Sequence, residues 1–253
     1  MRARTFTLEH AVRNLGNAEV HTGIEVREYE TGWHFHRGWQ FVQILSGERQ
    51  YEWRNGRMNL GPGQVLMVPP EWVHRGKSSQ SLISFVMVYL PTDSNSFQPA
   101  MLGCSPRIVS GVDLTTLRDG CESFVALCSH LSISGGTHVS SVASSRATAE
   151  KVRNRIHPLE RLPSLPEIGS MVSRSPYYVS HLLRQQFGMS PRGFHLQLRL
   201  NDARNMLLQG KTPATVAMEF GFADQSHFGR HFRRAFSLTP GFFATWVKVE
   251  YRR

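Results

Sequence analysis

Hydrophobic and polar positions change their period about halfway along the chain. Between residues 24 and 89, short apolar stretches alternate with turn-forming residues such as Gly, Pro, Asn and Ser. From residue 148 to the end, apolar positions recur every three or four residues, as on one face of a helix. We therefore predict a β-rich N-terminal region and an all-helical C-terminal region.

The β-rich region shows the two-residue alternation that is typical of strands with one buried face. Polar side chains alternate with Tyr51 and Trp53, and Asn55-Gly56 directly after them predicts a tight hairpin turn. Further Gly-Pro and Pro-Pro turn signals recur at short intervals. Evenly spaced strands without intervening helices predict a succession of antiparallel strands in a sandwich or small barrel.

Ser or Thr followed by Pro marks several helix starts in the second half, because the hydroxyl caps the helix and Pro fits its first position. Ser164 and Glu167 add a capping box, and Asp224 can cap another helix. The predicted helices span residues 148–157, 165–172, 176–187, 191–209, 213–220, 225–236 and 240–247.

The segments 165–187 and 213–236 are similar, each with a short helix, a tight turn and a second helix, and the long helix 191–209 joins them. Gly221 supplies the positive φ that the second turn needs. Phenylalanines at helical spacing are predicted to fill the core of the second segment: Phe220, Phe222, Phe228, Phe232, Phe236, Phe242 and Phe243. Two helix-turn-helix units on one connecting helix are a DNA-reading layout.

The formal net charge of +10 is concentrated in the helical half. Residues 147–253 contain 16 Lys and Arg against 7 Asp and Glu, whereas residues 1–146 contain 13 against 12. A localised basic excess indicates a polyanionic partner, either nucleic acid or an acidic membrane surface. The helical layout favours double-stranded DNA, bound by sequence or, alternatively, without sequence preference as by a nucleoid-type protein.

Between the two halves, residues 113–131 switch to helical spacing and residues 132–147 are rich in Ser, Gly and Thr. We predict a trailing helix followed by a linker. The apolar helix face through Leu117, Phe124 and Leu131 predicts a dimerisation surface, or alternatively packs on the protein's own barrel.

Cys104, Cys121 and Cys128 are widely spaced and lack the C-x-x-C pattern of zinc ribbons and redox sites, so we expect ordinary reduced thiols. The first ten residues contain no continuous apolar stretch, and no run reaches the roughly 18 apolar residues of a membrane span. The sequence therefore predicts a cytoplasmic protein with no membrane partner.

Residues 222–243, FADQSHFGRHFRRAFSLTPGFF, closely resemble the second helix-turn-helix of the AraC/XylS transcription regulators. The resemblance continues upstream without a gap through residues 162–222. It implies that the helical domain binds two successive major-groove segments on one face of DNA, and it tilts the expected effect toward activation.

On the two recognition helices, 176–187 and 225–236, apolar positions define an inner face and leave other residues outward. By position and by the family resemblance, the base-facing residues are Tyr177, Ser180, His181, Gln225, Ser226, His227 and Arg230. Gln225 could pair with adenine and Arg230 with guanine. Basic residues that we expect on phosphates are Arg174, Arg184, Lys211, Arg233 and Arg234.

Residues 34–75 resemble the cupin-type effector domain that commonly precedes this helical module. His34-x-His36, Gln40 and His74 lie at the spacings of the two cupin motifs, in which metal-binding members place three His and one Glu around an ion. Because a neutral amide at the Glu position is a weak ligand, we expect no cofactor and no metal. The alternative is a metal held by His34, His36, Gln40 and His74.

Four of the five tryptophans lie between residues 33 and 72 of the predicted barrel. They could line an effector pocket or simply fill the interior of a small barrel. The residues predicted for the pocket are His34, His36, Trp39, Arg49, Trp53 and His74. Either Arg49 or Arg75 could hold the carboxylate of an effector.

These patterns together predict a two-domain chain: an all-β cupin-like barrel with a trailing helix (1–131, sensing and dimerisation), a linker (132–147) and an all-α domain of two helix-turn-helix units (148–253). We predict a homodimeric DNA-binding transcription activator that responds to a small-molecule effector, contacts RNA polymerase and is not an enzyme. The alternative is a metal-dependent cupin enzyme with a helical appendage, whose site would be the three histidines and Gln40.

Overall fold

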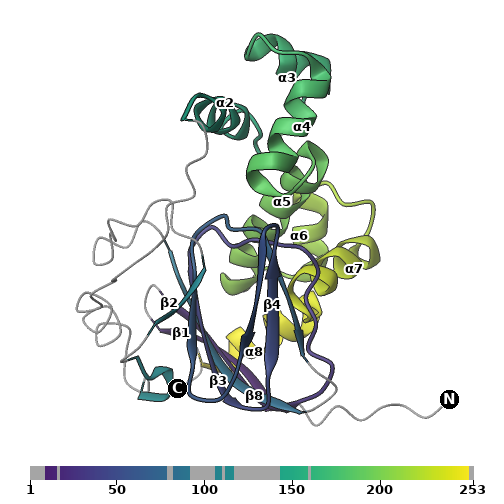
Figure 1. Cartoon of the computed structure of the whole chain (residues 1–253). Helices are drawn as coiled ribbons and strands as arrows, with labels where there is room; N and C mark the ends of the chain where they lie inside the picture. The colour runs from purple at the N-terminus through teal and green to yellow at the C-terminus, as the bar shows by residue number, and fades with distance from the viewer. Residues whose placement is uncertain are drawn as a thin grey trace, which may run out of the picture. The chain divides into compact units, whose positions relative to one another are not determined.

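The computed structural model divides the chain into two compact units, one built from strands and one from helices. The structure describes residues 9–15, 18–78, 82–91, 106–109, 112–116, 143–158 and 161–250. Figure 1 shows the strands in purple to teal and the helices in green to yellow, so the change of period in the sequence coincides with the change of structure.

The β unit contains two antiparallel sheets. Its described strands are β1 (Glu9–Leu15), β2 (Ala18–Val26), β3 (Trp39–Ser46), β4 (Arg49–Trp53), β5 (Gly56–Leu60), β6 (Val65–Val68), β7 (His74–Ser78), β8 (Ile83–Leu90) and β9 (Arg107–Val109). Six strands pair in the order β1-β2-β8-β3-β6-β9 and three in the order β5-β4-β7. The predicted succession of antiparallel strands is confirmed.

Both faces of the larger sheet are buried, because its strands alternate between two apolar clusters. On β3, Val42 and Ile44 join a cluster that also contains Tyr51 and Leu60 of the smaller sheet. This cluster, which we call the interior cluster, therefore lies between the two sheets. Phe41 and its neighbours on the other face of β3 form a second cluster, the outer cluster.

The hairpin between β4 and β5 turns one residue earlier than predicted. Trp53 pairs with Gly56, so the two-residue turn is Arg54-Asn55 and Gly56 is the first residue of β5. The Trp53 side chain explains the glycine, since a Cβ added at Gly56 would lie 2.6 Å from the indole Nε1. Glycine here serves a close approach, not a left-handed turn.

The helical unit follows the predicted cap signals closely. Its helices are α2 (Ala143–Arg153), α3 (Leu165–Met171), α4 (Pro176–Phe187), α5 (Pro191–Leu208), α6 (Pro213–Glu219), α7 (Gln225–Phe236) and α8 (Pro240–Glu250). Ser164 and Glu167 form the predicted capping box, and Asp224 accepts from the backbone N–H of His227. Within the described residues, no helix is long and apolar enough to cross a membrane.

The first helix of this unit begins earlier than predicted, at Ala143 rather than residue 148. Its first residues are alanine and serine. Serine-rich composition predicts a linker, but alanine is also the best helix former. The buried side chains of Ala149 and Val152 attach α2 to the unit. The last residues of the predicted linker are therefore helical.

Aromatic packing forms the core of the second helix-turn-helix, as predicted. The ring of Phe232 lies 5.4 Å from that of Phe228, 4.8 Å from Phe236 and 5.6 Å from Phe243. Phe242 is only half-buried, so it contributes less to this core than predicted. Gly221 adopts φ +64°, which confirms the left-handed turn before α7.

Most of the predicted dimerisation helix, with Leu117, Phe124 and Leu131, lies outside the described residues, and so do the three cysteines. Its described beginning is a 3-10 turn, Leu114–Thr116. Leu114 is buried in the outer cluster, and its backbone N–H donates to the side-chain oxygen of Gln43 at 2.6 Å. The start of the segment therefore packs on the protein's own barrel.

Candidate functional site

The recognition helix of the first helix-turn-helix, α4, presents a polar face outward. Val179, Leu182 and Leu183 are buried, which leaves Tyr177 and His181 exposed on the opposite side. Tyr177 is 80% exposed, and its ring stacks on that of His181 at 6.2 Å. Because this large aromatic side chain lies in the first turn of α4 and is exposed to solvent, it is available for contact with a partner. Ser180, also predicted to face bases, is half-buried.

The second recognition helix, α7, has the clearest division into two faces. Phe228 and Phe232 are fully buried, whereas Gln225, Ser226 and Arg230 are exposed. Because the cap at Asp224 begins the helix directly before Gln225, the exposed Gln225 and Ser226 are its first two residues. This is the part of a recognition helix that reaches base edges in the major groove.

His227 differs from its neighbours because the fold constrains its ring. Its Nδ1 accepts from the backbone N–H of Ala223, and its Nε2 lies 3.0 Å from the Nε2 of His231. With Nδ1 as acceptor, the neutral ring of His227 donates through Nε2. The pKa of His231 is lowered, mainly because its ring is partly buried and secondly because His227 lies beside it. The sequence did not single out His231, although its i, i+4 spacing from His227 predicts contact.

All five residues predicted to contact phosphates are exposed: Arg174, Arg184, Lys211, Arg233 and Arg234. Arg174 directly precedes the cap of α4, and Lys211 directly precedes the cap of α6. Arg233 and Arg234 lie in the last turn of α7, which favours cationic side chains. Four of the five basic side chains therefore lie in, or directly before, the two helices that carry the predicted base readers, and Lys211 lies before α6.

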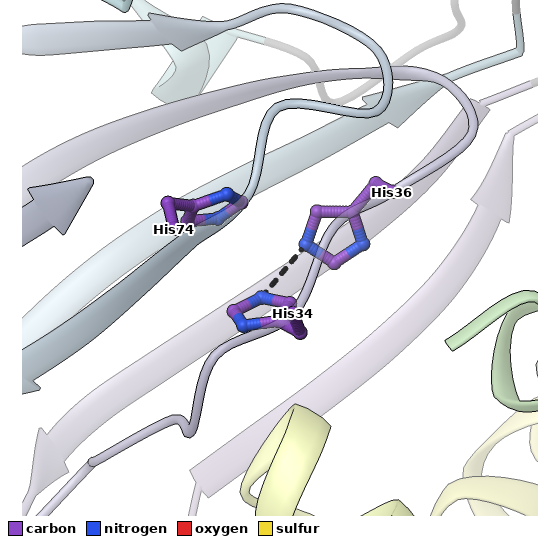
Figure 2. Close-up of side chains that lie close together, drawn as sticks. All are labelled: His34, His36 and His74. Atoms are coloured by element: carbon purple, nitrogen blue, oxygen red, sulfur yellow. Dashed lines mark hydrogen bonds between the residues drawn. The ribbon is translucent and has the colours of Figure 1, made fainter. Parts of the chain in front are cut away.

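Three buried histidines gather in the barrel interior. His34 and His36 come from the loop before β3, and His74 begins β7. Backbone hydrogen bonds between His34 and His74 in both directions, at 2.9 Å, join the two segments. Figure 2 shows the three rings facing one another, with Nε2 of His34 and His36 3.1 Å apart. The structure thus brings together three residues that the sequence separates by up to 40 positions.

Backbone carbonyls orient two of these imidazoles. Nδ1 of His34 donates to Gly32 O at 2.8 Å, and Nδ1 of His74 donates to Trp72 O at 2.7 Å. Burial lowers the pKa of His74 to about 4, so its ring is neutral at neutral pH. The Nε2 of His74 then carries a lone pair, and it has no hydrogen-bond partner among the described residues.

Gln40, the fourth residue of the predicted set, lies in the same interior but is linked to the histidines indirectly. Its amide donates to the hydroxyl of Tyr89 at 3.0 Å, and the ring of Tyr89 lies 4.6 Å from that of His36. The amide oxygen of Gln40 is buried and has no partner among the described residues. Tyr89 was not among the residues predicted for the pocket. It lies two residues after the interior residue Met87 on β8, and this spacing could have indicated that its side chain faces the interior.

A buried hydrogen-bonded pair extends this polar region along β2. His21 pairs with Glu19, and the ring of His21 lies 5.1 Å from that of Tyr89. Both residues alternate with Val20, which belongs to the outer cluster, so their side chains face the interior. No sequence signal indicated this pair, because β2 precedes residues 34–75, which carry the cupin resemblance.

Arg49 is the most deeply buried cation in the described barrel, at 1% exposure. One guanidinium N–H donates to Tyr29 O, and the guanidinium lies 4.5 Å from the ring of Tyr29 and 5.3 Å from that of Tyr51. Gly76 leaves space for it, since an added Cβ would lie 2.3 Å from Nη2. No carboxylate partner of Arg49 is found among the described residues, and its Nε has no hydrogen-bond acceptor there.

Three other residues weighed for the pocket are placed differently. Trp39 lies in the outer cluster, because it is one residue away from the interior-facing Gln40 on β3. Trp53 is partly buried against the interior cluster. Arg75 is bound to Glu52, with Nε 2.7 Å from the carboxylate, so its charge is already neutralised. Arg49 is therefore the arginine available to an interior ligand.

Two family matches cover most of the described chain. Residues 20–112 match the family described as "AraC-like ligand binding domain", and residues 168–245 match a "Helix-turn-helix domain". The first match contains the three histidines and Arg49, and the second contains both recognition helices.

Curated relatives agree with this division. The chain is 25% identical over 232 residues to the uncharacterized HTH-type transcriptional regulator YobQ of Bacillus subtilis, covering 85% of this chain and 90% of that protein. It is 34% identical over 80 residues to the arabinose operon regulatory protein of Escherichia coli, an alignment that covers only 27% of that protein.

Solved structures of ToxT from Vibrio cholerae share the fold of the chain. One matches with a TM-score of 0.59 and 12% identity over 93% of this chain and 98% of that chain. A second, with unsaturated fatty acid bound, matches with a TM-score of 0.58 and 13% identity over 97% of this chain and 98% of that chain. These matches therefore show a shared fold along nearly the whole chain.

Proposed function

Since the chain is a transcriptional regulator of the AraC type, with a ligand-binding domain before a helix-turn-helix domain, we propose that α4 and α7 read two successive major-groove segments of one operator. The observation that carries this proposal is the exposed first turn of α7 over a fully buried aromatic face. Recognition helices use that turn to reach base edges.

The base readers we propose are the outward residues of the two helices: Tyr177, Ser180, His181, Gln225, Ser226, His227 and Arg230. Gln225 and Arg230 have side chains that can make paired hydrogen bonds to adenine and guanine. His227 is the weakest member of the set, because its ring nitrogens are engaged with Ala223 and His231. The phosphate contacts proposed are Arg174, Arg184, Lys211, Arg233 and Arg234.

Selection of bound sequences from random duplex DNA tests this proposal. We expect the full chain to enrich two short motifs separated by about 10 base pairs, since two recognition helices on one face of DNA lie about one helical turn apart. The affinity for the best site should exceed that for random DNA by about 1,000-fold or more at physiological salt. Tight low-salt binding without enrichment would instead indicate a non-specific DNA-binding protein.

We also propose that the barrel interior binds a small-molecule effector with an anionic group beside Arg49. A buried guanidinium with no carboxylate partner in the described chain is unfavourable by itself, and an effector carboxylate would compensate its charge. The guanidinium lies over the rings of Tyr29 and Tyr51, and these cation–π contacts hold it in place. Burial raises the pKa of Tyr51, so its hydroxyl stays protonated and can donate to the same anion.

Replacing Arg49 with methionine should remove the response to carboxylates while the barrel remains folded. We expect binding of a stabilising carboxylate to weaken about 10- to 100-fold, the value of a charge-assisted hydrogen bond of about 1.5–3 kcal/mol. The measurement is the shift in melting temperature with a panel of aliphatic and aromatic carboxylates and their uncharged amides. The control is Arg75→Met, which removes a cation that is already paired with Glu52. If carboxylates shifted the melting temperature equally in both variants, the role of Arg49 would be rejected.

The last parts of the proposal concern the assembly, location and effect of the protein. We propose that the protein acts as a homodimer in the cytoplasm, where it meets the chromosome, and activates transcription through contact with RNA polymerase. We also propose that the barrel binds its ligand without transforming it. Gln40 stands at the position where metal-dependent cupins carry a glutamate, and its neutral amide is a weak metal ligand.

A further inference from the structure

Arg199 lies on the connecting helix α5, but its side chain contacts the turn of the second helix-turn-helix. Its guanidinium donates to the backbone carbonyl of Phe220 and lies 4.2 Å from the centre of the Phe222 ring. The side chain is partly buried, and burial lowers its pKa, whereas the five residues predicted to contact phosphates are exposed. Because a guanidinium stays charged in proteins, Arg199 brings a permanent cation to this turn.

The end of α6 provides a physical reason for this contact. Phe220 is the C-terminal cap of α6, and the last carbonyls of a helix have no N–H partner within the helix. The N–H of Phe222 closes the turn by donating to Ala217 O at 2.9 Å, and this bond leaves Phe220 O to another donor. Arg199 is that donor, and the helix dipole also favours a cation at a helix C-terminus. Arg199 therefore completes the cap of α6.

The residues of this turn are joined to the beginning of α7. The ring of Phe222 lies 5.0 Å from that of Phe228 and 5.7 Å from that of His227. The backbone N–H of Ala223 donates to Nδ1 of His227. Phe222 lies only three residues before Gln225, the first residue of α7. A guanidinium that holds Phe222 in place therefore also determines where α7 begins.

The first helix-turn-helix is built differently at the corresponding position. There the N–H of Arg174 donates to Gly169 O at 2.9 Å, so Arg174 has the place in its turn that Phe222 has in the second. Arg174 is exposed, whereas Phe222 is buried and has Arg199 over its ring. The contact of Arg199 belongs to the second unit, so its loss should affect α7 and leave α4 unchanged.

The connecting helix α5 contacts both helix-turn-helix units. At its N-terminal end the ring of Phe194 lies 5.4 Å from that of Phe187 at the end of α4, and further along α5 contacts α6 (Figure 1). We propose that Arg199 is a positioning residue, which holds the turn before α7 against α5 and so fixes the spacing and angle at which α4 and α7 meet DNA. This inference rests on the proposed paired reading of the operator, and it names a residue that sets the geometry of that reading without contacting DNA.

Hydrogen exchange in the full chain without DNA tests the positioning directly. In Arg199→Met, we expect the backbone amides of residues 220–228 to exchange about 10-fold faster or more, because the variant loses a charge-assisted hydrogen bond. Exchange in α4 should be unchanged. The control is Arg192→Met, a change at an exposed arginine of α5, which should leave both segments unchanged. Unchanged exchange of residues 220–228 in a folded Arg199→Met protein would overturn the proposal.

Operators with altered spacing test the consequence for DNA reading. One added base pair rotates one motif by about 35° around the DNA axis, so we expect it to weaken binding of the wild-type chain by about 10-fold or more. Arg199→Met should lose most of this spacing preference but keep its base preference in the motif read by α4. Its salt dependence should equal that of the wild type, because no phosphate contact is removed. An unchanged spacing preference with a smaller salt slope would instead identify Arg199 as a phosphate contact.

Arg199→Lys separates the geometry of the guanidinium from its charge. Lysine keeps the cation and a donor for Phe220 O, but it lacks the planar group that stacks on Phe222. We therefore expect exchange and spacing preference between those of the wild type and of Arg199→Met, and far-UV circular dichroism checks that both variants fold. Wild-type values of both in Arg199→Lys would contradict a role of the guanidinium. If the wild-type chain selected no paired motifs, the proposed function would fail, and the exchange experiment would still decide the role of Arg199 in the turn.

Discussion

Replacing Phe232 with alanine should lower the free energy of unfolding of the helical unit by about 3–5 kcal/mol, the cost of removing a fully buried phenylalanine. Phe232 is 0% exposed and contacts the rings of Phe228, Phe236 and Phe243. Domains have a total stability of about 5–15 kcal/mol, so this loss approaches the whole. We therefore expect α7 to lose its fixed position and operator binding to be abolished.

Urea unfolding followed by far-UV circular dichroism measures this loss, because most of the described helix lies in the affected unit. Arg233→Ala, at the next position on the exposed face of α7, is the matched control, and its stability should change by less than about 0.5 kcal/mol. The four tryptophans of the barrel should report an unchanged transition in both variants. Similar losses in the two variants would show that the aromatic cluster is not the core of the unit.

The helical unit was largely predictable from its sequence because its signals are local. A serine or threonine directly before a proline specifies a helix start, and the hydroxyls of Ser175, Ser190 and Thr212 cap their helices as predicted. The capping box of Ser164 and Glu167 specifies another start in the same local way. The buried and exposed faces of α7 follow equally directly from the spacing of Phe228, Phe232 and Phe236.

The barrel interior was less predictable, because it depends on the register of strands that are distant in sequence. The tryptophan-rich segment predicted one pocket, yet Trp39 faces the outer cluster and Trp33 is 43% exposed beside Arg75. A shift of one residue exchanges the two faces of a strand, so composition alone cannot assign a side chain to the interior.

The histidines show both the strength and the limit of motif spacing. His34 and His36 do converge, but they lie in a loop held by a bridge to His74, not in a regular strand. Their support from Gly32 O and Trp72 O depends on backbone geometry that no spacing reveals.

Two of the three arginines of α7, Arg230 and Arg233, should separate sequence-specific base reading from general electrostatic attraction to DNA. Arg230 lies one turn after the start of the helix and is exposed, four residues after Ser226 on the same helix face. Arg233 lies in the last turn, beside the exposed Arg234. Because recognition helices read bases with their N-terminal half, Arg230 is placed to meet a guanine and Arg233 to meet a phosphate.

Arg230→Ala should therefore weaken binding to the selected operator by about 1–3 kcal/mol and relax the preference at one base position. Arg233→Ala should weaken binding to operator and random DNA alike, and should reduce the slope of log affinity against log salt by about one. Fluorescence anisotropy with the operator, its single-base variants and a random duplex at several salt concentrations measures both effects. If Arg230→Ala lowered every affinity equally and kept the base preference, Arg230 would contact the phosphate backbone, and base reading would have to come from Gln225 and Ser226 or from α4.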